Sequence, residues 1–270
     1  LCCRSAFLAT TIRIRERPDD VNVLAMLRHA LEAQRKYHAA LVLAKKVVRL
    51  LPNDGVQWDR LAATYLCLDR FDEAKVAIER SLELSPDNPV HWHQAGLLAY
   101  RTGKIAESLR MYEEAAKLNP YGLNLRLDRA HTAMAIGNDL SSALEEYEVR
   151  WDIIYHLSPW DLRLPEWKGE PIDGKRFLLH SEQGHGDALM TARFARDLIA
   201  FGAAEVGLVV PDESVRLIEA QEWPRVRALR FEGLSADDWD VQSPAFSALK
   251  HLGYRVDEID PSPYFVAPPV

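Results

Sequence analysis

The first half of the chain repeats every 34 residues, and this period constrains the fold more than any other feature. Pro52, Pro86 and Pro120 stand 34 residues apart, and Trp58 and Trp92 keep the same spacing. Further columns hold small or apolar residues in step, namely Ala40, Ala74 and Ser108, and Leu50, Leu84 and Leu118. A period of 34 residues is typical of stacked helical hairpins. We therefore expect the first half to form an α-helical solenoid.

Each repeat is expected to contain two helices. In the third repeat the first helix is predicted from about Val90 to Tyr100 and the second from about Ile105 to Leu118, with a turn at 101–104. Pro120 then stops the second helix, because proline lacks the backbone N–H that would continue it. The predicted repeats are 21–54, 55–88, 89–122 and, less regularly, 123–156, so the repeat domain covers 21–157. Residues 1–20 precede it with no assigned role.

The third repeat places large and small residues where one known family has them, at Trp92, Gly96, Ser108, Tyr112 and Pro120. The chain resembles the tetratricopeptide repeat family in this half. The resemblance implies a curved stack whose concave side, lined by the first helix of each hairpin, binds a protein or peptide partner. The implied partner groove contains Asn22, His29, Asp59, Leu66, His93, Leu97, Tyr100, Arg101, Asn124, Leu127, His131 and Met134.

An alternative use of the repeats stays open. The array could simply hold the second half of the chain in place and bind no partner. The groove histidines His29, His93 and His131 lie on separate hairpins, and metal ligands must converge on one point, so we expect no metal site.

Composition narrows the classes of function. The net charge of −7 argues against nucleic-acid binding, which depends on many cations that neutralise phosphates. No apolar run is long enough to span a membrane. The three cysteines, Cys2, Cys3 and Cys67, have neither disulfide nor metal-ligand spacing, which favours a reduced, cytoplasmic setting.

The second half, from 158 to 270, shows a different pattern, in which short apolar runs alternate with helical segments. Strands are predicted at 177–180, 205–210, 226–231 and 240–243, and helices at 187–201, 213–220 and 245–252. Such alternation predicts a parallel sheet with helical crossovers. The loop Glu182-Gln183-Gly184-His185-Gly186-Asp187 follows the first strand, where glycines let a ligand approach the backbone and a helix start offers free N–H groups.

The second half also carries a run of residues with a family pattern of its own. It reads Trp167, Gly169, Gly174 and Lys175, then Glu182, Gln183, Gly184, Gly186 and Asp187, then Arg193 and Phe194. Two shorter stretches, Tyr147-Glu148-x-Arg150-Trp151 and Pro263-Tyr264, fit the same pattern. This half resembles the glycosyltransferase-like segments that follow tetratricopeptide repeats, and more distantly heptosyltransferase-like enzymes of the GT-B fold.

That second resemblance implies the Rossmann-like N-terminal half of a GT-B transferase. Asp187 would be the general base for a sugar acceptor's hydroxyl, and Glu182, Gln183, Gly184, His185, Gly186 and Arg193 would form a ligand-binding loop. Asp187 also stands at a predicted helix start, where aspartate is a common cap, so a capping role stays open beside the catalytic one.

The donor-binding half of a GT-B enzyme is not recognisable in these 270 residues. We therefore expect no cofactor in this chain, with a nucleotide sugar needed only by a full-length enzyme, and we expect the chain alone to be inactive. Three interpretations remain: part of a longer transferase, a non-catalytic protein-interaction scaffold, or a domain that binds a nucleotide or sugar without chemistry.

Overall fold

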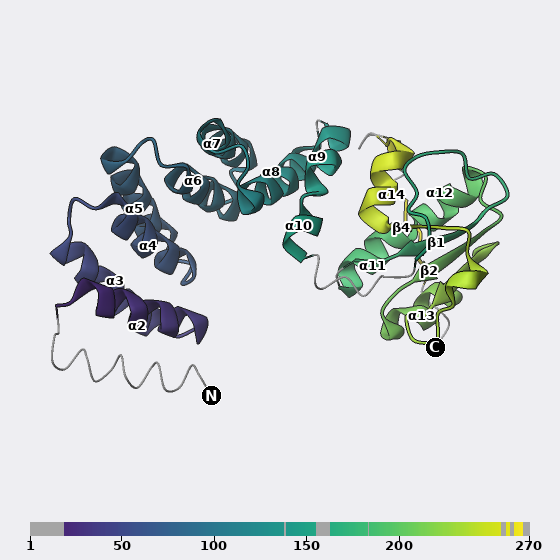
Figure 1. Cartoon of the computed structure of the whole chain (residues 1–270), viewed down its shortest axis with the longest axis horizontal. Helices are drawn as coiled ribbons and strands as arrows, with labels where there is room; N and C mark the ends of the chain where they lie inside the picture. The colour runs from purple at the N-terminus through teal and green to yellow at the C-terminus, as the bar shows by residue number, and fades with distance from the viewer. Residues whose placement is uncertain are drawn as a thin grey trace. The chain divides into compact units, whose positions relative to one another are not determined.

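The computed structural model of the chain describes residues 19–137, 139–154, 163–182, 184–254, 258–259 and 262–266. The chain divides into two compact units, one ending at Ile136 and the other beginning at Gly137. Figure 1 labels their helices and strands. The N-terminal unit consists of helices, and the C-terminal unit combines helices with a small sheet.

The N-terminal unit is a series of helical hairpins, which confirms the predicted solenoid. Its helices are α2 (Val21–Ala33), α3 (Tyr37–Leu50), α4 (Gly55–Leu66), α5 (Phe71–Leu84), α6 (Pro89–Arg101), α7 (Ile105–Leu118) and α8 (Leu123–Ile136). The first helices of successive hairpins pack on one another, α4 on α6 and α6 on α8. They therefore form the inner side of the stack, as the resemblance to tetratricopeptide repeats implied.

The residues that begin and end the first helices recur every 34 positions. Asp20, Asp54 and Asn88 accept backbone hydrogen bonds at the starts of α2, α4 and α6 and so satisfy N–H groups that have no partner within the helix. After these helices and α8 the backbone turns through left-handed geometry, at Arg35, Asp69, Gly103 and Gly137. The capping residues therefore follow the 34-residue period, as the buried residues do.

The prolines of the repeat have a second role besides ending helices. The indole N–H of Trp58 donates to the carbonyl of Pro52 at 2.8 Å, and that of Trp92 donates to the carbonyl of Pro86 at 2.7 Å. Each bond ties the start of a new hairpin to the turn before it, which explains why proline and tryptophan keep the same spacing.

Small residues allow the two helices of the third hairpin to approach. A Cβ atom on Gly96 would lie 2.4 Å from the ring of Tyr112, so no larger residue fits without displacement. The hydroxyl of the fully buried Ser108 donates to the Gly96 carbonyl at 2.8 Å. Tyr112 thus occupies the space that Gly96 leaves.

The C-terminal unit contains the predicted parallel sheet. Its strands are β1 (Arg176–His180), β2 (Glu205–Val209), β3 (Val226–Leu229) and β4 (Val241–Pro244), in the order β3-β2-β1-β4. All three neighbouring pairs are parallel. The helices are α11 (His185–Ala192), α12 (Phe194–Ala200), α13 (Asp212–Glu219) and α14 (Ala245–Leu252), so the single helix predicted at 187–201 is in fact two that meet at Arg193.

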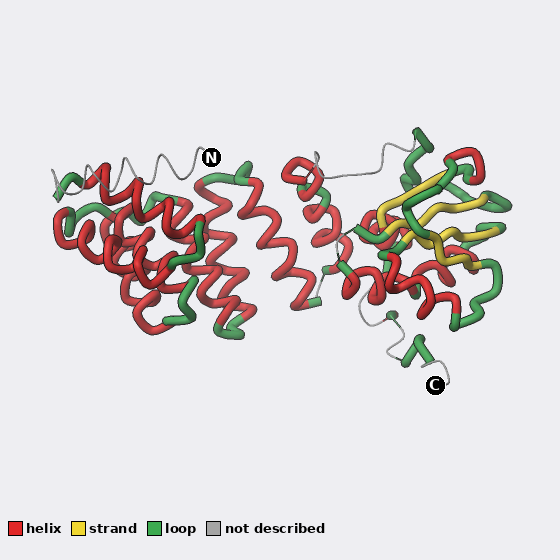
Figure 2. The backbone as a smooth tube through the Cα atoms, turned by 90° about the horizontal axis from the view of Figure 1, so that it is seen from below, coloured by secondary structure: helices red, strands yellow, loops and turns green. Residues whose placement is uncertain are grey.

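The α-helices α11 to α14 lie on one face of this sheet. Phe177 and Leu179 of β1 join one core with apolar residues of α11 to α14, whereas Leu178 points the other way and packs with Trp239. Figure 2 shows the α-helices beneath the strands, with loops and one short 3-10 helix, Ala236–Asp238, above them. A doubly wound sheet carries helices on both faces, so the described layers differ from the Rossmann-like arrangement that we expected.

The predicted fourth repeat is divided between the two units. Helix α8 belongs to the first, while α9 (Leu140–Tyr147) and α10 (Arg150–Ile154) belong to the second, so the division precedes the boundary predicted at 157. The reason is side-chain packing: the ring of Tyr147 meets that of Phe246 edge-on, with centroids 5.4 Å apart, and Lys250 Nζ lies 3.3 Å from Glu145. These contacts fix α9 to α14.

Candidate functional site

Polar bridges connect the first helices on the inner side of the repeat unit. They are Thr64 to Glu32 (hydroxyl to carboxylate, 3.0 Å), Arg101 to the carbonyl of Leu66 (2.7 Å), and His93 to Asp128 (Nε2 to Oδ2, 2.6 Å). Each bridge joins one hairpin to the next. Arg101 also forms an ion pair with Asp69. His93 and Arg101, which the resemblance placed among the partner-binding residues, therefore contribute to the stacking of the hairpins.

The other predicted groove residues differ in their exposure. Asp59 and Leu66 are buried, so neither presents its side chain at the surface. Leu97, Leu127 and Met134 are half-buried, and the remaining members are exposed: Asn22, His29, Tyr100, Asn124 and His131. Five of these residues, Leu97 and Tyr100 on α6 and Leu127, His131 and Met134 on α8, lie on two helices that pack together. We call these five residues the α6–α8 surface.

Asp59 is the unusual member of the predicted groove. It is 2% exposed, and within the described residues its Oδ1 has no hydrogen-bond partner. Burial raises its pKa to about 6, although the charges of Arg60 and His93 oppose the shift. The described residues contain no group of three or more histidine, cysteine or acidic side chains placed to hold a metal ion. Asp59 is thus a buried and incompletely hydrogen-bonded carboxyl group in the core of the repeat unit.

In the C-terminal unit, the loop after β1 meets a buried guanidinium. Arg150 of α10 donates to Glu182 from both Nε (2.5 Å) and Nη2 (2.9 Å), and both side chains are almost completely buried. Glu182 also accepts the backbone N–H of Phe246, at the start of α14, at 2.9 Å. The Glu182 carboxylate thus lies at the carboxyl ends of β1 and β4, and its oxygens are already bonded within the protein.

Further bonds complete the environment of Arg150. It donates to Ser247 Oγ at 2.9 Å and to Glu148 Oε1 at 2.7 Å, and it lies 4.6 Å above the Tyr147 ring and 4.5 Å above the Trp151 ring. Sequence reasoning noted the Tyr147–Trp151 stretch and the Glu182 loop separately, 32 residues apart. It did not assign Arg150 or Ser247 to a site, since neither spacing nor residue type revealed that the stretch and the loop meet.

The remaining residues of the predicted ligand-binding loop run from the end of β1 through α11. His185 begins α11, and its Nδ1 is 3.1 Å from Ser214 Oγ of α13. Asp187 is the third residue of α11 and is half-buried. The N-cap of α11 is Gly184, so Asp187 does not cap this helix. Arg193 stacks on the ring of Tyr264 at 4.8 Å. Gln183 lies outside the described residues.

The two loop glycines have no steric reason to be glycine. A Cβ atom on Gly184 or Gly186 would meet nothing within 4 Å, and neither residue has a left-handed backbone. This contrasts with Gly96 in the repeats and with Gly207 of β2, where a Cβ would lie 2.3 Å from Trp239. No described residue therefore covers Gly184 or Gly186.

His180 ends β1 directly before this loop. It is 2% exposed. Burial lowers its pKa to about 3, and the positive charge of Arg150 adds to the effect. The imidazole is therefore neutral at ordinary pH, which fits a core position better than a role in proton transfer.

Comparison with known proteins supports the repeats. The family described as tetratricopeptide repeat matches residues 58–88 and 92–121. These segments fall within the second and third hairpins, so the N-terminal unit contains tetratricopeptide repeats.

Two curated relatives extend this picture. Protein FlbA of Caulobacter vibrioides is 27% identical over 188 residues, which cover 68% of this chain and 31% of FlbA. Since 68% of the chain exceeds the N-terminal unit, the match includes part of both units. The N-terminal acetyltransferase A complex auxiliary subunit NAA15 of Arabidopsis thaliana is 24% identical over 128 residues, covering 47% of this chain and 14% of NAA15. The chain thus spans about a third or less of either relative.

Among solved structures, the tetratricopeptide repeat protein TTC0263 of Thermus thermophilus aligns with a TM-score of 0.48 and 18% identity. The alignment covers 60% of this chain and 86% of TTC0263.

Proposed function

We propose that this chain is a protein-interaction scaffold whose repeat unit binds a protein or peptide partner. The observation that carries the proposal is the match of two repeats to the tetratricopeptide family, together with inner helices that leave apolar side chains accessible. Curved repeat arrays commonly bind along this side. One relative, NAA15, is itself named as the auxiliary subunit of a complex.

The α6–α8 surface is the part of the inner side best suited to hold a partner. Tyr100 is exposed beside the half-buried Leu97, and Met134 and Leu127 extend the apolar area onto the next hairpin. Aromatic side chains surrounded by apolar neighbours often contribute most of the binding energy of an interface. His93 and Arg101 secure the stacking at its margin. We infer that the partner contributes apolar side chains to this surface.

Selection of random peptides on the full chain tests this proposal. Peptides that bind the wild type should bind Tyr100→Ala at least about tenfold more weakly, because an aromatic anchor is lost. Tyr121→Ala is the matched control, since Tyr121 is 83% exposed in the turn before α8 and lies outside the α6–α8 surface. Equal binding to both variants would contradict the assignment of this surface.

A second candidate function is a transferase-like sugar or nucleotide site in the C-terminal unit. Two observations favour it: no described atom would meet a Cβ on Gly184 or Gly186, and the strand order β3-β2-β1-β4 matches the first four positions of the dinucleotide-binding order 3-2-1-4-5-6. In this candidate Asp187 is the base for an acceptor hydroxyl, and His185 and Arg193 border the ligand.

The bonds of the loop argue against this candidate. Glu182 is committed to Arg150 and Phe246, Arg193 stacks on Tyr264, and the described helices cover only one face of the sheet. Calorimetric titration of the full chain with uridine diphosphate sugars decides between the candidates. Heat that saturates with the wild type and disappears with Gly184→Val would support the second candidate. If no heat were observed with the wild type, only the scaffold function would remain.

A further inference from the structure

The two edges of the four-stranded sheet differ in whether their outward backbone groups are hydrogen-bonded. At the β4 edge, the segment before β1 covers the strand: the Gln242 N–H donates to the carbonyl of Pro165 at 2.9 Å, and the Trp167 N–H donates to the carbonyl of Gln242 at 2.7 Å. The Gln242 side chain adds a bond to the carbonyl of Leu164 at 3.2 Å. The backbone groups of this edge are therefore satisfied within the chain.

Strand β3 forms the other edge and has no such cover among the described residues. Val206 N donates to the carbonyl of Arg225 and Val210 N to that of Leu229, so alternate residues of β3 face β2. Ala228, which lies between, directs its N–H and C=O away from the sheet. Neither group has a backbone partner within the described part of the chain. An edge with unpaired backbone groups is a template for a further strand.

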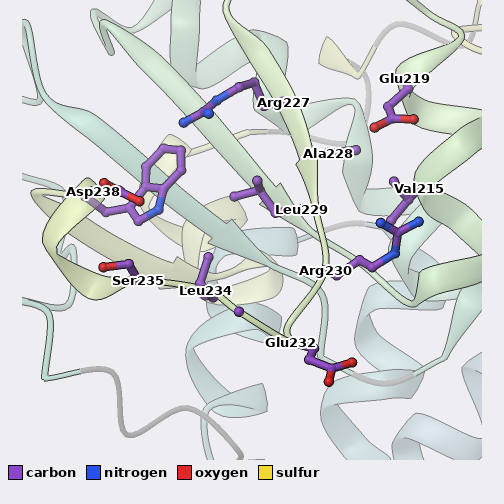
Figure 3. Close-up of a pocket in the computed structure, with 12 residues that line it drawn as sticks. Val215, Glu219, Arg227, Ala228, Leu229, Arg230, Glu232, Leu234, Ser235 and Asp238 are labelled. Carbon is purple, nitrogen blue, oxygen red and sulfur yellow. The ribbon is translucent and has the colours of Figure 1, made fainter.

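A groove runs along this free edge. It has a volume of about 280 Å³ and is bounded on one side by Val215 and Glu219 of α13 and on the other by Leu234, Ser235 and Trp239. Figure 3 shows Arg230 and Val215 on one side of the β3 ribbon and Leu234 on the other. The groove therefore offers contacts to both faces of an added strand, whose side chains alternate.

The charged groove residues that form no ion pair with a described residue are acidic. Its two basic residues are already paired, Arg227 with Glu205 and Arg230 with Asp212, and Arg227 also lies 5.4 Å from the Trp239 ring. Glu219 and Glu232 line the groove and form no ion pair with any described residue. An occupant with positive side chains matches these two carboxylates.

We propose that the free edge of β3 binds an extended, basic segment of a partner protein as an additional parallel or antiparallel strand. The backbone of Ala228 supplies the hydrogen bonds, which depend on no sequence, and Glu219 and Glu232 select lysine or arginine at alternating positions. This surface belongs to the C-terminal unit and does not depend on the repeat unit's α6–α8 surface.

The test uses the full chain labelled with ¹⁵N and a capped peptide of alternating lysine and valine. The expected result is saturable binding that shifts the Ala228 amide resonance and slows its exchange with solvent. Ala228→Pro removes the outward N–H and leaves the bonds to β2, so it should weaken binding about tenfold or more. Ala228→Ser, which keeps that N–H, is the matched control and should bind as the wild type does.

Two altered peptides keep the test decisive even where Ala228→Pro does not fold. A peptide N-methylated at alternate residues cannot pair as a strand and should lose binding, and a peptide of alternating glutamate and valine should bind about tenfold more weakly. Equal binding of the N-methylated peptide, absence of binding by the lysine peptide, or resonance shifts confined to residues 19–137 would each overturn the proposal.

Discussion

The two units hold their helices together in different ways. In the repeat unit, bridges such as His93 to Asp128 and Arg101 to Leu66 are spread over successive hairpins, and each is partly exposed. In the C-terminal unit, one buried guanidinium, that of Arg150, joins α10, the loop after β1 and the start of α14. A repeated structure can divide its polar contacts among equivalent steps, whereas the second unit concentrates them at one point.

The largest expected difference between the units is their response to acid. The pKa of His180 is about 3 in the folded C-terminal unit and near its usual value of about 6.5 when unfolded. Between these values the unfolded chain takes up a proton that the folded unit does not. The free energy of unfolding of this unit should therefore fall by up to about 5 kcal/mol as the pH drops from 6.5 to 3.

Hydrogen exchange of the strand amides as a function of pH measures this loss in the C-terminal unit alone. His180→Gln removes the titrating group, so its exchange rates should show a smaller dependence on pH. If the variant kept the full dependence, His180 would not be its source.

The next largest effect is expected from the buried ion pair. Arg150→Met leaves the buried Glu182 carboxylate without an opposite charge, and such losses cost about 3–5 kcal/mol of the free energy of unfolding. Arg101→Met in the repeat unit breaks an exposed pair with Asp69 and the hydrogen bond to the Leu66 carbonyl, and should cost less, about 1–2 kcal/mol. Urea denaturation of both variants measures the contrast.

Adding Glu182→Gln to Arg150→Met removes the stranded charge and should restore part of the lost stability. Similar losses for the Arg150 and Arg101 single variants would show that the C-terminal unit does not depend on one buried contact.

Asp59 gives the repeat unit a pH dependence of opposite sign. Its folded pKa of about 6 exceeds its usual value of 3.8, so the unfolded chain releases the proton first as the pH rises. The free energy of unfolding of the repeat unit should fall by about 3 kcal/mol between about pH 4 and 6 and then stay level. Asp59→Asn should abolish this fall and leave the variant more stable than the wild type at neutral pH. If the hydrogen-exchange protection of α4 in Asp59→Asn still fell between about pH 4 and 6, Asp59 would not be the source of this pH dependence.

Glycines provide the smallest and most local comparison. Gly96→Ala places a methyl group against the Tyr112 ring, and overpacking of this kind costs about 1–3 kcal/mol. Gly184→Ala meets no described atom and should cost about 1 kcal/mol or less, chiefly because alanine is a poorer N-cap than glycine. Thermal denaturation of the two variants tests the difference, and a loss at Gly184 equal to that at Gly96 would mean that its loop is more tightly packed than the structure describes.

The candidate sites were predictable to different extents. The inner helices of the repeats follow directly from the 34-residue period, and so does the accessible position of Tyr100. The burial of Asp59 does not follow, because its column also holds His93, which stays half-exposed. The loop after β1 was located correctly, but the pairing of Glu182 with Arg150 depends on how α10 packs, and no local pattern specifies that.

The sequence by itself determined the helical hairpins, their caps and the order of strands and helices in the second half. These features depend on local backbone preferences and on contacts between neighbouring repeats, which recur at a fixed spacing and so leave a periodic record. Only the tertiary structure decided that α9 joins the second unit and that the described α-helices cover one face of the sheet. It also decided that β4 is covered, whereas no described segment pairs with the outer edge of β3. Each of these outcomes depends on individual contacts between distant parts of the chain, such as that of Tyr147 with Phe246. Because such a contact occurs only once, it produces no repeating pattern in the sequence.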